Sequence, residues 1–84
     1  MSALCGFAGW LDRFLSEKGV DLEEMIEVEG ALGMNLIPVR ALADAMKGAP
    51  AREQKGIRTM MVKIDFVNGD VRRYLRHLAK AIAL

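Results

Sequence analysis

The sequence predicts an all-α fold, a small bundle of four to five short helices, and three observations support this. Apolar residues recur at helical spacing along most of the chain, Gly and Pro separate the periodic segments, and 52% of the 84 residues are hydrophobic. The alternative is an α+β fold in which residues 57–67 form a strand, paired in a small sheet or across a dimer. The length fits one small helical domain over residues 1–84.

The N-terminal segment predicts an amphipathic helix over residues 3–18, which Gly19 ends. Trp10 lies towards the edge of its apolar stripe and is expected to fill the core or an interface. Cys5 is the only cysteine and therefore cannot form an intramolecular disulfide, so we expect a small core residue in a reducing compartment. The stripe consists of Leu4, Phe7, Ala8, Leu11, Phe14 and Leu15.

Residues 22–29 predict a second helix because its start carries strong local signals. Asp21 is a favourable N-cap, and Glu24, three residues later, completes a capping box. The alternative is a short strand over residues 25–29, in which apolar and acidic residues alternate. The carboxylates of this segment are interpreted as a solvated acidic face and not as a cation site.

A glycine-containing loop over residues 30–35 is followed by a third predicted helix. Asn35 is its expected N-cap, and Pro38 fits the first turn, where a missing N–H costs nothing. Gly48 should end this helix, and Pro50 should open the next one. Its apolar face consists of Leu36, Val39, Leu42, Ala43 and Met46.

Residues 50–67 fit a helix and a strand almost equally well. Helical spacing joins the apolar residues from Ile57 to Val67, whereas the alternation and β-branched content of residues 60–66 favour a strand. Pairing favours the helix, because a lone strand leaves its backbone groups unpaired and the other candidate strands, 25–29 and the proline-containing 35–39, are weak. The dipeptide Asn68-Gly69 predicts a chain reversal in either case.

The last segment predicts a basic amphipathic helix that Asp70 caps. One face is an apolar stripe that we expect to be buried: Val71, Tyr74, Leu75, Leu78 and Ile82. The opposite face is expected to be exposed and is the candidate surface for a protein partner or a nucleic acid: Arg72, Arg73, Arg76, His77 and Lys80.

Charge is distributed unevenly although the net charge is only +1. Residues 1–35 carry a net charge of −5, residues 36–56 carry +2 and residues 57–84 carry +4. The acidic and basic segments can pair with each other within the fold or between protomers, or the basic segment can bind an external anion.

No catalytic or cofactor motif is present in the sequence. One His and one Cys cannot supply a usual zinc site from one subunit, and there is no HExxH, phosphate-binding glycine loop or GxSxG. His77 lies among basic residues of its own helix, which makes it a poor general base. We therefore expect that the protein is not an enzyme and that it binds neither a cofactor nor a metal ion.

The remaining functional hypothesis is a small regulatory or adaptor protein that acts through protein–protein interaction and self-association, with a dimer as the first expectation. The alternative is a nucleic-acid-binding regulator that uses the basic C-terminal helix. The N-terminus lacks the features of a signal peptide and no apolar run is long enough for a membrane span, so we expect a cytoplasmic protein without a membrane partner.

Overall fold

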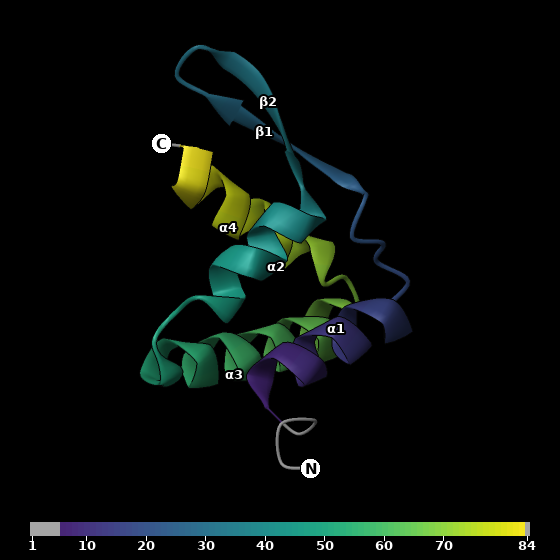
Figure 1. The fold of residues 1–84 in the computed structure, drawn as a ribbon. Helices are drawn as coiled ribbons and strands as arrows, with labels where there is room; N and C mark the ends of the chain where they lie inside the picture. Colours follow the sequence, from purple (N-terminus) through teal and green to yellow (C-terminus); the bar gives the residue numbers. More distant parts are fainter. Residues whose placement is uncertain (1–5, 84) are drawn as a thin grey trace.

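The computed structural model describes the backbone of residues 6–83 and the side chains of residues 6–81 (Figure 1). In chain order its elements are α1 (Phe7–Glu17), β1 (Met25–Gly30), β2 (Gly33–Pro38), α2 (Val39–Lys47), α3 (Ala51–Asn68) and α4 (Arg72–Ala83). The described residues thus form four helices and a two-stranded antiparallel sheet, so the fold is α+β and the all-α prediction is wrong. Residues 57–67 lie in α3, which excludes the strand placed there and confirms the helix.

The predicted helix over residues 22–29 is wrong, because this segment forms β1 of a hairpin with β2. Asp21 does accept the N–H of Glu23 at 2.9 Å, but the bond closes a turn and not a helix. Strand geometry places Ile26 and Val28 on the face that is buried against α4. The residue pairs Ile26–Ile37 and Val28–Asn35 define the register, and Gly33 leaves the tight turn with a φ of 121°.

Helix α2 begins four residues later than its predicted cap, Asn35, which lies in β2. No side chain caps α2. Instead, the N–H of Val39 donates to the carbonyl of Glu24 at 2.8 Å, and the N–H of Arg40 donates to that of Leu22 at 2.9 Å. The segment before β1 therefore satisfies the first orphan donors of α2 and fixes the base of the hairpin against the helix.

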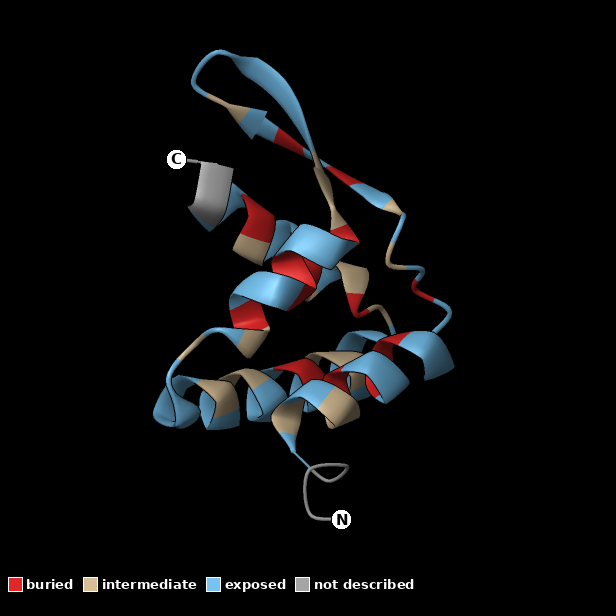
Figure 2. Ribbon diagram, viewed as in Figure 1, coloured by how far each residue is buried: buried red, intermediate tan, exposed pale blue. Residues whose placement is uncertain are grey.

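The core lies between the four helices and β1, as the red segments of Figure 2 show, and α3 contributes Met61 to it. Its largest side chains with less than 2% exposure are Leu11, Leu15, Leu42, Met46, Met61, Leu75 and Val39. Four of the five residues of the expected α2 face are buried as predicted, whereas Leu36 lies exposed in β2. Cys5 and Leu4 lie outside the described residues.

Helices α1 and α3 lie side by side at the base of the molecule in Figure 1. Trp10 of α1 stacks on Phe14, with ring centroids 4.8 Å apart, and the guanidinium of Arg58 from α3 lies 4.9 Å from the Trp10 ring. Lys18 and Asp65 form an ion pair of 2.8 Å between the same two helices. Trp10 therefore packs where α1 meets α3, in agreement with its expected role.

The predicted reversal between α3 and α4 is confirmed. Gly69 has a φ of 66°, and its N–H donates to the carbonyl of Asp65 at 2.8 Å, which ends α3. Across the described part of the chain, no helix has both the length and the apolar character that a membrane span requires.

Candidate protein-interaction surface

Helix α4 is positioned by its cap and by one buried stripe. The Asp70 carboxylate accepts the N–H of Arg72 at 3.0 Å, as the capping prediction required. Val71 and Leu75 are buried as predicted, together with Ala79, which the prediction missed because alanine gives a weak apolar signal. Tyr74 and Leu78 are only half-buried, and the side chain of Ile82 lies outside the described residues.

Arg72 does not belong to the exposed basic face that the sequence predicts, because its side chain binds other residues of the same fold. Its guanidinium makes a bidentate pair with Glu24, with Nε to Oε2 at 2.5 Å and Nη2 to Oε1 at 2.9 Å, and Nη2 also donates to the Gly19 carbonyl at 3.0 Å. The hydrogen bond from Arg72 lowers the pKa of Glu24 below its usual value. The pair ties the start of α4 to the start of the hairpin.

The other predicted residues remain at the surface. Arg76 lies 3.7 Å from the Asp70 carboxylate in an exposed pair that contributes little to stability. Arg73, His77 and Lys80 are exposed and form no ion pair with any described residue. Three fixed cations and one histidine are thus available on this side of α4.

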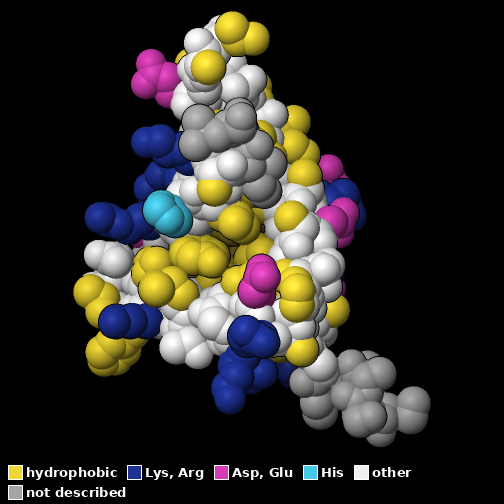
Figure 3. Space-filling model, turned by 90° about the vertical axis from the view of Figure 1, so that its left-hand side faces the viewer, with side chains coloured by type: hydrophobic (Ala, Val, Ile, Leu, Met, Phe, Trp, Pro, Cys, Tyr) yellow, Lys and Arg dark blue, Asp and Glu magenta, His cyan; other side chains and the backbone are white. Residues whose placement is uncertain are grey.

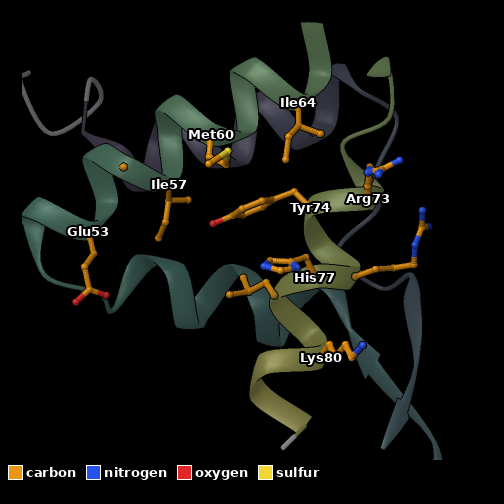
Figure 4. A pocket seen from close by; sticks show the side chains of 11 residues that line it. Glu53, Ile57, Met60, Ile64, Arg73, Tyr74, His77 and Lys80 are labelled. Carbon is orange, nitrogen blue, oxygen red and sulfur yellow. The ribbon is translucent and has the colours of Figure 1, made fainter. Parts of the chain in front are cut away.

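These four residues border a groove between α3 and α4 with a volume of about 830 Å³. Figure 3 shows the groove as a hollow of hydrophobic side chains, with basic side chains and the single histidine along one side. The side chains of Figure 4 come from both helices. Helix α3 contributes Glu53, Gly56, Ile57, Met60 and Ile64, and α4 contributes Arg73, Tyr74, Arg76, His77, Leu78 and Lys80.

The floor of the groove is apolar. Ile57, Met60 and Ile64 project from α3 towards α4, and the Tyr74 ring extends from α4 towards them (Figure 4). Burial raises the pKa of Tyr74. Gly56 has no side chain, and a Cβ atom built on it would meet nothing within 4 Å. The groove is therefore open above the first half of α3.

The groove combines an apolar floor with titratable side chains at its border. Within the described residues no three His, Cys, Asp or Glu side chains gather so that they could hold a metal ion. His77 has no carboxylate partner among the described side chains and has Arg73, Arg76 and Lys80 on its own helix. What the groove offers is apolar surface that water leaves favourably, with positive charge along one edge.

The α3 side of this surface was missed at the sequence level. Helical spacing places the apolar residues from Ile57 to Val67 on one face of α3, and Met61 is the buried member of that face. The one signal that pointed elsewhere is Gly56, since a glycine inside a helix costs about 1 kcal/mol and calls for a reason.

No protein-family model, no curated protein and no solved structure matches the chain.

Proposed function

We propose that this chain is a non-enzymatic regulatory or adaptor protein of the cytoplasm that binds an acidic, amphipathic helix of a protein partner in the groove between α3 and α4. The observation that carries the proposal is the combination of an apolar floor with a basic edge on one concave surface. Self-association is the second part of the proposed function and uses another surface, described below.

The chemistry of the groove defines the partner. Arg73, Arg76 and Lys80 follow one another at spacings of three and four residues, so they line an edge about 10 Å long. Carboxylates at the same spacings on a docked helix meet them in register. The apolar stripe of that helix lies on Ile57, Met60 and Ile64, and the charges orient it and speed its association.

A nucleic acid is the alternative occupant, because the same cations would attract phosphate. Two features favour a protein. Arg72 is taken up by Glu24, which removes one of the five predicted contacts, and the surface beside the remaining cations is apolar, whereas a phosphate backbone needs hydrogen-bond donors.

The test uses two designed helical peptides with the same leucine stripe, one carrying glutamates and one carrying lysines at the flanking positions. Fluorescence anisotropy should show binding of the glutamate peptide and at least about tenfold weaker binding of the lysine peptide. Gly56→Leu fills the open part of the groove and should weaken binding of the glutamate peptide by at least about tenfold. Val62→Leu is the matched control, because Val62 is an exposed α3 residue outside the groove.

Two results would contradict the proposal: equal binding of both peptides, or a Gly56→Leu variant that binds as the wild type does. A labelled DNA duplex and a labelled RNA hairpin provide the third arm. Binding of either that falls steeply with salt and is unaffected by Gly56→Leu would identify the nucleic-acid alternative.

A further inference from the structure

We infer that strand β2 is a self-association edge, along which a second copy of this chain pairs in antiparallel orientation to form a continuous four-stranded sheet. The inference specifies the self-association part of the proposed function. It uses a surface separate from the groove, so either can fail without the other.

The edge of β2 is unprotected. Within the described residues the sheet has only two strands, so β2 has one edge with unpaired backbone groups. Edge strands are usually protected by charged side chains, by proline, by a bulge or by a covering element. β2 has no charged residue, its four residues from Gly33 to Leu36 are all exposed, and its only proline is the last residue, Pro38.

The exposed side chains of β2 match those of a second β2. Met34 and Leu36 are 62% and 59% exposed and lie on the outward face of the hairpin, opposite Glu29 and Glu27. With Asn35 on a two-fold axis, Met34 lies opposite Leu36 of the second copy. The four apolar side chains then form one cluster on one face of the sheet. A shift of the pairing register by one residue would place the Met34 and Leu36 side chains of the two copies on opposite faces.

Electrostatics favours β2 over β1 as the shared edge. A β1 to β1 pair places the glutamates at positions 27 and 29 of the two copies about 5 Å apart, where like charges repel. In a β2 to β2 pair the two β1 strands are three strand spacings apart, about 14 Å, which exceeds the Debye length of about 8 Å at physiological ionic strength. A β1 to β2 pair leaves one β1 edge and one β2 edge free, so the same contact can repeat and extend into a fibre. The two-fold β2 pair uses both β2 edges and leaves only the two β1 edges, so the same contact cannot repeat.

Cysteine cross-linking tests the pairing directly in a Cys5→Ala background. Asn35→Cys places two cysteines across the axis at a non-hydrogen-bonded position, where the Cα atoms lie about 4.5 Å apart and a disulfide fits. Glu29→Cys is the matched control, since it is an exposed position of the other strand. After mild oxidation, a non-reducing gel should show a covalent dimer for Asn35→Cys and at least about fivefold less for Glu29→Cys.

A charge variant provides a second, independent measurement. Met34→Lys with Leu36→Lys sets each lysine opposite a glutamate of its own hairpin, which preserves the monomer, but opposes lysines across the dimer. Sedimentation equilibrium should show a dimer dissociation constant at least about tenfold higher for this variant. Phe66→Lys, a single apolar-to-lysine change at an 89% exposed residue of α3, should change the dimer dissociation constant by less than about twofold.

The inference is overturned if the wild-type protein is monomeric at every accessible concentration, if the double lysine variant associates as the wild type does, or if both cysteine variants cross-link equally. Circular dichroism of each variant verifies that the fold is retained. Gly56→Leu should leave the dimer unchanged, and the double lysine variant should leave peptide binding in the groove unchanged, so a failure of one proposal is distinguishable from a failure of the other.

Discussion

Helices α2 and α3 use their apolar residues in different ways. Helix α2 has nine residues, and four of them are buried: Val39, Leu42, Ala43 and Met46. Helix α3 has eighteen residues, all described, and only Met61 is buried. The short helix thus supplies a full face to the core, whereas the long helix keeps most of its apolar residues at or near the surface.

This difference separates a helix that belongs to the core from one whose apolar surface is largely uncovered. A helix packed on one side normally buries a continuous apolar stripe, as α2 does. In α3 the corresponding stripe includes Met60, which is 45% exposed, and the half-buried Ile57 and Ile64 in the groove. Apolar surface that the fold leaves uncovered contributes little to stability and is the usual mark of an interaction surface.

The largest predicted effect tests this contrast by truncating one side chain in each helix. Leu42→Ala removes a fully buried side chain of α2 and should lower the free energy of unfolding by about 3 kcal/mol. Met60→Ala in the groove should lower it by less than about 1 kcal/mol. Thermal unfolding should therefore show a fall in Tm of roughly 12–24 °C for the first variant and a few degrees for the second.

The same pair of variants should show the opposite order in peptide binding. Met60→Ala should weaken binding of the glutamate peptide. The Leu42→Ala variant, measured well below its Tm, should bind this peptide almost as tightly as the wild type does. Equal losses of stability in the two variants would show that α3 is as much a part of the core as α2.

Most helices were predictable from the sequence because their signals are local. The stop at Gly19, the reversal at Gly69 and the cap at Asp70 each depend on residues within one or two turns. The hairpin was not predictable in this way. Its two strands satisfy each other's backbone groups, but the local signal of each strand alone is weak. In β2 the signal is weakened by Pro38, although a proline at the end of an edge strand removes no ladder bond.

The candidate site was predictable only on its α4 side. Periodicity identified Arg73, Arg76, His77 and Lys80, but it could not show that Arg72 meets Glu24, which lies 48 residues away in the chain. Nor could it show that α3 packs incompletely, because the stripe from Ile57 to Val67 has the same spacing as a core face. Both facts depend on how the elements pack together, which a local pattern does not contain.

The second prediction concerns the other wall of the groove, since α4 is held to the hairpin by the pair between Arg72 and Glu24. The pKa of Glu24 lies below its ordinary value of 4.5 in the folded protein. The stabilisation by this pair is therefore fully present above pH 4.5 and is lost as the pH falls through the lower, folded pKa. Glu24→Gln should cost about 1 kcal/mol at neutral pH, after allowance for partial exposure of the pair.

Urea unfolding of the wild type and of Glu24→Gln at a series of pH values measures this linkage. The difference between the two proteins should be largest at neutral pH and should vanish in acid, because a protonated Glu24 and a glutamine both lack the charge. Glu29→Gln is the control, an exposed glutamate of β1 with no ion-pair partner among the described residues. A difference that is independent of pH would show that the charge of Glu24 does not hold α4 in place.

The smallest predicted effect is the change in the free energy of unfolding for Gly56→Ala, and its sign is the result that matters. Gly56 lies inside α3, and an added Cβ would meet nothing within 4 Å, so Gly56→Ala should raise the free energy of unfolding by about 0.5–1 kcal/mol. If this face of α3 were packed as tightly as α2, the extra methyl group would force a shift and the substitution would destabilise the protein. Gly69→Ala is the control, since its φ of 66° makes any side chain unfavourable and the variant should lose stability. Chemical denaturation of the two variants, without peptide, measures these changes in the free energy of unfolding. A rise for Gly56→Ala beside a fall for Gly69→Ala indicates an open groove, whereas a fall for both indicates a packed helix face.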